Sequence, residues 1–303
     1  MLFYAIFTPL STVLGELAEN NNVNEYIILA ITMVSNFILE YLYTRFIVYR
    51  NSCDTTYNNK TNKSLVYRLL KFFINVFYRK RTFFGLENLT NGPYIFIANH
   101  AQIHGPLIAE VQFPLKRKTW CIGNVLTTKE FIEHAKTDFW GQKPKWIRWF
   151  FYLLAYIIAP IGSNVFNNAD IIGVYKDARL SKTFKETVRY LNKGYNIIIF
   201  PECPTPYNNI INEFQNKFID VAKLYYKLYG KHINFVPMYN AVRLQKILLG
   251  NPIKFNPTSP IEEERIRICD YLKNEITNLA LSLPSHEVVQ YVNKGRRKNP
   301  ISK

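Results

Sequence analysis

Two short apolar runs constrain the fold of this chain more than any other feature of its sequence. Residues 94–97 and 197–200 are β-forming residues without a polar interruption, and each run is followed by polar residues. A continuous run of this length is typical of a strand buried on both faces, as in a parallel sheet covered by helices. In such sheets, reactive side chains collect where the strands end. We therefore expect His100 and Glu202, which follow the two runs, to lie close together.

The segments around these runs predict helices. Residues 181–191 carry apolar side chains at helical spacing, Gly194 stands where a helix would end, and the run at 197–200 follows directly. Further helices are expected over residues 65–77, 106–112, 214–228 and 261–279. This alternation predicts an α/β fold with a mixed, mostly parallel sheet flanked by helices.

The length and charge of the chain limit the kinds of partner that it can bind. A chain of 303 residues with 48% hydrophobic residues can form one large domain with a full core and an appendage. The net charge is +16, from 38 Lys and Arg against 22 Asp and Glu. Such a charge suits nucleic acid, an anionic membrane face or an anionic substrate. Because the chain has an apolar N-terminus and no recognisable nucleic-acid motif, we expect a membrane and no nucleic acid.

The cysteine and histidine positions indicate neither disulfides nor a metal. The four cysteines are scattered without C-x-x-C spacing, and no histidine stands at metal-ligand spacing from them. A reduced compartment and an absence of metal are therefore expected. Cys203, directly after Glu202, could act as a nucleophile, but a small filler side chain is the better account of it.

The first fifty residues are expected to form a membrane anchor of two helices. Residues 1–17 are apolar but contain Pro9, and residues 26–49 are long enough to cross a ~30 Å hydrocarbon core. Basic residues after the second span place that end in the cytoplasm by the positive-inside rule. The chain then divides into an anchor (1–50), a polar linker (51–64), a catalytic domain (65–292) on the cytoplasmic face of the cell membrane, and a basic tail (293–303).

Part of this anchor resembles another family. Residues 36–50 are similar to the last helix of the GtrA-like membrane proteins, which are implied in moving polyprenyl-linked sugars. The resemblance covers half of that family's helices, and a plain anchor is the alternative. Because half a transporter cannot transport alone, the segment would form a homodimer, recruit a membrane-protein partner or merely tether the chain. Glu40, within the second span, would need a partner there.

Two later apolar stretches are expected to meet lipid. Residues 65–77 are apolar at helical spacing with Arg68 and Lys71 between, which predicts an interfacial helix, with a solvated helix on the core as the alternative. Residues 146–161 are too short for a comfortable span. They predict a wall of an acyl-chain channel or a shallow membrane insertion, and a core helix is the alternative.

The residues at the two strand ends resemble signature blocks of the glycerolipid acyltransferases, the lysophosphatidic-acid and glycerol-3-phosphate acyltransferase superfamily. Asn99 and His100 match the start of the first block, N-H-x-x-x-x-D, and residues 200–202 match the start of the third, F-P-E-G-T-R. Residues 235–237 are similar to the V-P of the fourth block. The likeness extends over residues 80–256, and the order of the blocks makes it more specific than any one of them.

The first block departs from this family at Gly105, where its aspartate would stand. The resemblance implies a neutral His100 that takes a proton from an acceptor hydroxyl, while the aspartate would hold the ring tautomer. Three substitutes for the aspartate are open: a carboxylate from Glu202 or Glu110, a backbone carbonyl on the other ring nitrogen, or His104 acting as the base. A purely structural His104 is the alternative.

The third block departs at residues 203–205, which lack its glycine and arginine. By resemblance, Glu202 helps to bind the acceptor or to order the site. The residues expected on the acceptor side are Asn99, Gly105, Pro201, Cys203 and Thr205. The family is thought to use arginines on the acceptor's phosphate, and the cations available here without matching a motif are Lys176, Arg179 and Arg243. A neutral acceptor, such as a sugar hydroxyl or a glycolipid, would need none of them.

The resemblance implies a membrane-associated acyltransferase, similar to 1-acylglycerol-3-phosphate acyltransferases but lacking the aspartate of their H-x4-D motif. It would move an acyl group from acyl-CoA or acyl carrier protein, as co-substrate and without a bound cofactor, to a hydroxyl of a lysophospholipid, glycerolipid or glycolipid. The alternative is an inactive acyltransferase-fold protein that binds lipid or acts as a scaffold in cell-surface glycan or lipid synthesis. The lost aspartate and arginine favour that alternative, whereas Asn99, His100 and Glu202 argue against it.

Overall fold

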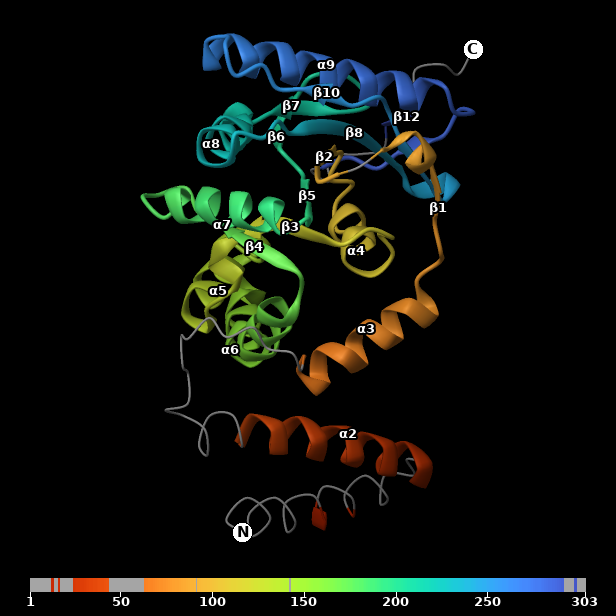
Figure 1. Ribbon diagram of the computed structural model, residues 1–303. Helices are drawn as coiled ribbons and strands as arrows, with labels where there is room; N and C mark the ends of the chain where they lie inside the picture. Colours follow the sequence, from red (N-terminus) through yellow and green to blue (C-terminus); the bar gives the residue numbers. More distant parts are fainter. Residues whose placement is uncertain are drawn as a thin grey trace. The chain divides into compact units, whose positions relative to one another are not determined.

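The computed structural model describes residues 12–13, 16, 24–43, 63–90, 92–141, 143–291 and 297–298 (Figure 1). The chain divides into two compact units, Met1–Thr61 and Asn62–Lys303. The first unit contains helix α2 (Glu25–Tyr43), whose apolar stretch Tyr26–Glu40 is shorter than a membrane span requires. Most of residues 1–17 and all of residues 44–50 lie outside the described residues, so the two-helix anchor and its GtrA-like part stay predictions.

The second unit is built on an eight-stranded sheet in the order β1-β9-β8-β2-β5-β3-β4, with β10 paired to β8. Its strands are β1 (Thr82–Phe84), β2 (Tyr94–Ala98), β3 (Arg117–Ile122), β4 (Ile171–Val174), β5 (Asn196–Ile199), β8 (Asn234–Ala241), β9 (Lys246–Leu249) and β10 (Ile253–Lys254). Strands β8, β2, β5, β3 and β4 run parallel, whereas β9 and β10 are antiparallel to β8. The predicted mixed, mostly parallel sheet is confirmed.

The two apolar runs form the centre of this sheet. Ile95 of β2 pairs with Ile197 of β5 on one side and with Phe235 of β8 on the other. Every residue of β2 and of β5 is buried, as an unbroken apolar run predicts. Because the three strands are parallel and in register, the chain leaves them at the same carboxyl edge.

The sheet is flanked by helices α4 (His104–Val111), α5 (Thr128–His134), α6 (Lys145–Asn168), α7 (Leu180–Asn192), α8 (Asp220–Tyr229) and α9 (Ile261–Leu281), and α3 (Leu65–Phe77) precedes it. The helix expected over residues 214–228 begins only at Asp220, because β7 (Asn212–Phe214) pairs with β6 (Glu202–Pro206). In the segment expected to be a basic tail, β12 (Arg297–Lys298) pairs with β11 (Glu287–Val288).

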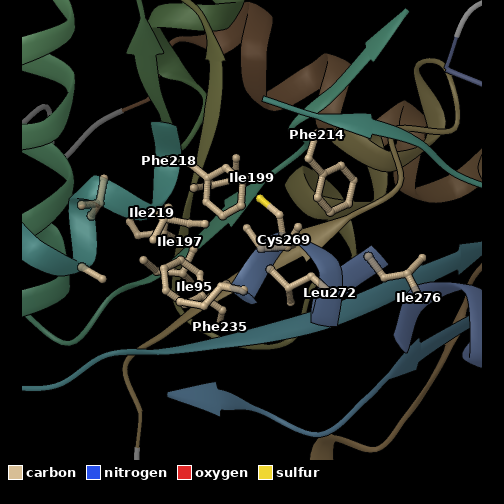
Figure 2. Packing of buried hydrophobic residues seen from close by; sticks show 14 of the residues in the cluster. Ile95, Ile197, Ile199, Phe214, Phe218, Ile219, Phe235, Cys269, Leu272 and Ile276 are labelled. Carbon is tan, nitrogen blue, oxygen red and sulfur yellow. The ribbon is translucent and has the colours of Figure 1, made fainter. Parts of the chain in front are cut away.

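The main core lies between the sheet and helices α7, α8 and α9 (Figure 2). From the strands come Ile95, Ile197, Ile199 and Phe235, and from the segment around α8 and from α9 come Phe218, Ile219, Cys269, Leu272 and Ile276. Helix α4 covers the opposite face, where Ile108 and Ala109 pack on Phe96 and Ile198. Both faces of the central strands are therefore covered, and reactive groups can gather only at the strand ends.

A buried ion network ties α3 and α4 to the sheet. Arg117, at the start of β3, lies 3.0 Å from a carboxylate oxygen of Glu110 and 3.8 Å from Asp170. The hydroxyl of Tyr67, on α3, bonds Glu110, and Lys63 pairs with Asp170 at 2.7 Å. Burial alone would raise the pKa of Asp170, but hydrogen bonds and charge from neighbouring lysines lower it below its usual value. The network holds α3 against α4.

The folded unit begins before the end of the predicted linker. Ser64 caps α3, since its hydroxyl accepts a hydrogen bond from the backbone N–H of Tyr67. The backbone N–H of Ser64 also donates to Asn168 at 2.8 Å, and its hydroxyl donates to Asn164 at 2.7 Å. Residues 63–64 thus pack with the domain that was expected to begin at residue 65. The rest of the predicted linker lies outside the described residues.

Candidate functional site

The chain leaving β2 meets the chain leaving β5 at a buried carboxylate. One oxygen of Glu202 accepts a hydrogen bond from the backbone N–H of His100 at 2.5 Å, and the other accepts from the backbone N–H of Asn212 at 3.0 Å. The side chain of Glu202 is only 5% exposed. Such charge-assisted bonds stabilise a carboxylate that burial would otherwise disfavour. The structure thus brings His100 and Glu202 together, through the backbone of His100 rather than through its ring.

The imidazole of His100 is held by a backbone carbonyl. Its Nδ1 atom bonds the carbonyl oxygen of Gln102. Because a carbonyl only accepts hydrogen bonds, Nδ1 carries the proton, and the lone pair of the neutral ring lies on Nε2. The ring packs edge-on against Phe200, with centroids 5.3 Å apart, and in a tilted arrangement against Tyr291, with centroids 4.9 Å apart. Among the described residues, no group hydrogen-bonds Nε2, which leaves that nitrogen able to accept a proton.

A left-handed turn directs the carbonyl of Gln102 back to the ring. Ala101 has a φ of 48° and Gln102 a φ of 55°, a region that residues with a side chain rarely adopt. The turn is closed by hydrogen bonds from the backbone N–H of His104 to the carbonyl of Ala101 and from that of Gly105 to the carbonyl of His100, each at 3.1 Å. Strained backbone of this kind collects at functional sites, where it fixes a side chain in one orientation.

Gly105 has no room for a side chain. A Cβ atom at this position would lie 2.5 Å from the carbonyl oxygen of His100 and 2.8 Å from the ring of Phe200. The aspartate that the family signature carries here therefore cannot be placed on this backbone without moving it. The glycine lets α4 begin directly against the chain at His100.

Burial keeps the ring of His100 neutral. Burial lowers its pKa from the ordinary value of 6.5, and the hydrogen bond to the carbonyl of Gln102 acts in the opposite direction. The net lowering means that the neutral form predominates at neutral pH. A neutral ring with the proton on Nδ1 is the form that a general base requires.

His104 has a partner of its own. Its Nδ1 atom lies 2.7 Å from the hydroxyl of Tyr78, and the two rings stack with centroids 6.0 Å apart. Burial, and then the positive charges of Arg81 and Arg243, lower the pKa of His104. Of the three substitutes considered for the missing aspartate, the structure shows the backbone carbonyl in contact with His100. The carboxylate of Glu110 belongs to the ion network of Arg117.

Asn99 joins β2 to β8. Its side-chain oxygen accepts a hydrogen bond from the backbone N–H of Asn240 at 2.7 Å, and its backbone carbonyl accepts one from the Asn240 side chain at 2.8 Å. Both asparagines are buried. The pair fixes the carboxyl ends of the two strands against each other. Asn240 was not predicted, because an asparagine inside an apolar strand carries no signal of its partner.

Residues 202–206 form β6, which pairs with β7 in a separate two-stranded sheet. The backbone carbonyl of Pro201 accepts from Gln215 at 2.9 Å, and the thiol of Cys203 donates to the carbonyl of Glu213 at 3.2 Å. Thr205 is exposed. These contacts are structural, and the thiol contact agrees with a filler role for Cys203. Within the part of the chain that the structure describes, no group of three or more His, Cys, Asp or Glu is placed to hold a metal.

The predicted cations are divided between two places. Lys176 and Arg179 follow β4, which is separated from β2 by β5 and β3, and Arg179 pairs with Asp177 at 2.8 Å and Glu130 at 2.9 Å. The structure does not bring these two cations to His100. Arg243 follows β8, the neighbour of β2, and pairs with Glu287 at 3.2 Å.

Two residues near His104, one aromatic and one cationic, were not predicted from the sequence. Tyr78 follows α3 and holds His104, and the guanidinium of Arg81 lies over the Tyr78 ring at 4.5 Å. In the sequence, Arg81 is one of three consecutive basic residues that follow the predicted interfacial helix, and nothing there marks it out. Because both residues precede β1 and are distant in sequence from His104, only the fold could place them there. With Arg243, Arg81 makes the surroundings of His104 positive.

Replacing Glu202 by glutamine is expected to lower the free energy of unfolding by ~1.5 to 3 kcal/mol, the size of hydrogen bonds to a charged group. The reason is that one carboxylate oxygen becomes an NH₂ group facing a backbone N–H. Urea unfolding would measure the change. The matched control Glu263→Gln removes an exposed carboxylate on α9 and should alter stability by less than ~0.5 kcal/mol. Equal stability of wild type and Glu202→Gln would show that the two backbone bonds contribute nothing.

Fold and site together define an α/β protein with a neutral histidine and a buried glutamate at the carboxyl edge of a mostly parallel sheet. Comparisons with models of known protein families and with curated protein sequences find no match. Among solved structures, the chain is similar to the 1-acyl-sn-glycerophosphate (LPA) acyltransferase PlsC from Thermotoga maritima, with a TM-score of 0.41 and 15% identity over 71% of this chain and 78% of that one. A likeness of this size carries no argument about chemistry, which rests on the residues themselves.

Proposed function

We propose that this chain is an O-acyltransferase in which His100 is the general base. The observation that carries the proposal is the contact of Nδ1 with the carbonyl of Gln102, which leaves Nε2 as the basic nitrogen. Nε2 would take the proton of an acceptor hydroxyl while the hydroxyl oxygen attacks the carbonyl carbon of an acyl thioester. The tetrahedral intermediate would then collapse to the ester, and the imidazolium would return the proton to the departing thiolate.

The carbonyl of Gln102 replaces one of the two roles of the missing aspartate. In serine proteases, exchanging the triad aspartate for asparagine lowers kcat by about 10⁴ because the wrong tautomer forms. A carbonyl cannot donate a hydrogen bond, so it fixes the correct tautomer as well as a carboxylate does. It carries no full negative charge, however, and stabilises the imidazolium less. The proposed enzyme would therefore be slower than one with a complete His-Asp pair, without being inactive.

The substrates follow from the chemistry and from the family resemblance. The donor would be a thioester, acyl-CoA or acyl carrier protein, used as co-substrate with no bound cofactor. The acceptor would be a lysophospholipid, glycerolipid or glycolipid, and Arg81 and Arg243 offer positive charge to an anionic headgroup. The protein would work at the cytoplasmic face of the cell membrane, where the N-terminal unit would tether it and form a homodimer or bind a membrane protein.

A lipid-binding or scaffold protein without activity is the second candidate. One observation favours it: the overlap that a Cβ atom at Gly105 would make with the backbone of His100 excludes the usual catalytic pair from this site. In this case His100, Glu202 and Asn99 would only maintain the fold of the carboxyl edge. The two candidates differ in whether label moves from a thioester to a lipid.

Acyl transfer from radiolabelled acyl-CoA and from acyl carrier protein into a total membrane lipid extract would test the proposal. We expect label in one lipid class with the wild-type chain and a large loss with His100→Asn. Equal background incorporation by the two folded proteins would favour the scaffold. A product whose formation does not depend on His100 would contradict the assigned base.

The pH dependence of this reaction is expected to follow the titration of the His100 ring. Only the neutral ring is a base, and because burial lowers its pKa below 6.5, kcat/KM should fall to half of its high-pH value at a pH below 6.5. The stability of the fold should depend on pH in the same direction. Because the pKa of His100 is lower in the folded chain than the ordinary 6.5, the unfolded chain binds the proton first as the pH falls. The free energy of unfolding therefore decreases as the pH falls from 6.5 through the folded pKa. His104→Asn should keep this fall in kcat/KM. A fall with its midpoint at or above pH 6.5 would contradict the assignment of His100 as the base.

A further inference from the structure

Helix α6 exposes an apolar face that the fold of its own unit leaves uncovered. Trp146, Trp149 and Leu153 recur at helical spacing on this face, and their side chains are 77%, 66% and 55% exposed. On the other side, Ala155 and Ala159 are buried in a cluster with Phe131. Of the described helices, only α6 is long and apolar enough to cross a membrane. Because one of its sides is packed along the helix, α6 suits a position in the plane of a membrane surface better than a span.

The charges on α6 itself are of one sign. Lys145 and Arg148 stand in the first turns of α6, Lys143 precedes them, and the helix contains no aspartate or glutamate. Tryptophan beside lysine and arginine is the pattern of side chains at a membrane–water interface, where the ring lies at headgroup level. A second copy of the chain would bring these cations together without an acidic partner on α6. An anionic lipid surface would pair with them.

The neighbouring helix has the same character. Helix α3 packs beside α6 and is bound to its C-terminal turns through Ser64. It also lacks acidic residues, and it exposes Phe72, Phe73 and Phe77. Both helices thus expose apolar side chains, and neither carries an acidic residue. Helices of this kind suit the surface of an anionic bilayer.

We propose that the exposed face of α6, defined by Trp146, Trp149 and Leu153, lies in the headgroup region of an anionic bilayer. This contact deepens the proposed membrane association by naming its surface, and it requires neither acyl transfer nor the N-terminal unit. The tryptophans enter the interface by about 5 to 10 Å, the depth of an amphipathic helix lying in the plane of the membrane. Lys143, Lys145 and Arg148 meet the lipid phosphates.

Tryptophan fluorescence tests this contact in the full chain, whichever part holds the protein on the membrane. The chain has four tryptophans, and Trp120→Phe with Trp140→Phe leaves only the pair on α6. With phosphatidylglycerol vesicles that contain lipids brominated near the headgroup, we expect the emission to shift to shorter wavelength and to lose most of its intensity. Phosphatidylcholine alone and high salt should weaken the effect.

Two controls keep the test decisive. Trp146→Phe with Trp149→Phe removes only exposed rings. The quenching that this variant loses relative to wild type comes from the tryptophans of α6, and it can be measured even if the variant without Trp120 and Trp140 fails to fold. Leu228→Trp on α8, at a 55% exposed position and in a chain whose four native tryptophans are replaced by phenylalanine, gives a single tryptophan that should stay unquenched. Vesicle binding with unquenched α6 tryptophans, no vesicle binding, or a concentration-dependent spectral shift without lipid would each overturn the proposal. None of these outcomes depends on acyl transfer.

Discussion

Replacing His100 by asparagine is expected to lower kcat/KM for acyl transfer by ~10²- to 10⁴-fold, the usual contribution of a general base. Asparagine is the informative substitution because its side-chain NH₂ group takes the place of Nδ1. It can still donate to the carbonyl of Gln102, which holds the ring in the wild type. The basic Nε2 atom is lost without a replacement. The variant therefore separates the chemistry of the ring from its part in the turn.

The matched control is His232→Asn, the same chemical change at an exposed histidine before β8. It should leave the rate unchanged, and both variants should unfold at urea concentrations close to that of wild type. The fall in kcat/KM below pH 6.5 should disappear in His100→Asn and remain in the control. If His100→Asn transferred acyl groups as fast as wild type, His100 would have only a structural role.

The central architecture could be predicted from the sequence because it depends on burial. Unbroken apolar runs form strands only where both faces are covered, so residues 94–97 and 197–200 indicated a parallel sheet and its reactive edge. The structure confirms the sheet and brings the ends of β2 and β5 together. The helix predicted after residue 214 was partly wrong, since residues 212–214 pair as a strand with the chain beyond Glu202. Neither of the two paired segments, Glu202–Pro206 and Asn212–Phe214, contains an apolar run, so no local pattern predicts the pairing.

From the sequence, the partner of the His100 ring could be given only as a backbone carbonyl, one of three alternatives, and not as a particular residue. A backbone carbonyl has no residue signature, and the turn that presents it depends on positive φ angles at Ala101 and Gln102, where no glycine marks the conformation. The contact between Tyr78 and His104 depends on how α3 packs, which the sequence does not determine locally. The residues at the ends of the two apolar runs, Asn99, His100 and Glu202, were found from the sequence. Their partners, the side chain of Asn240 and the carbonyl of Gln102, were not identified.

Restoring the family aspartate by Gly105→Asp is expected to damage the site instead of improving it. A Cβ atom would overlap the carbonyl oxygen of His100 at 2.5 Å, so the backbone that carries His100 must move. Overpacking of this kind costs about 1 to 3 kcal/mol, and Gly105→Ala should show it alone. The aspartate adds a carboxylate beside the backbone carbonyls of Asn99 and His100, which repel it. We expect Gly105→Asp to be less stable than Gly105→Ala and to lose most acyl transfer.

Urea unfolding and the acyl-transfer assay, applied to the same preparations, would separate the two effects. Ile103→Asp is the control, since it adds a carboxylate to the same turn at a side chain that is 69% exposed. It should change stability little, because its charge stays in water. A Gly105→Asp variant more active than wild type would mean that the turn can rearrange to form a His-Asp pair. The carbonyl of Gln102 would then be a poor substitute, and not the partner around which the turn is built.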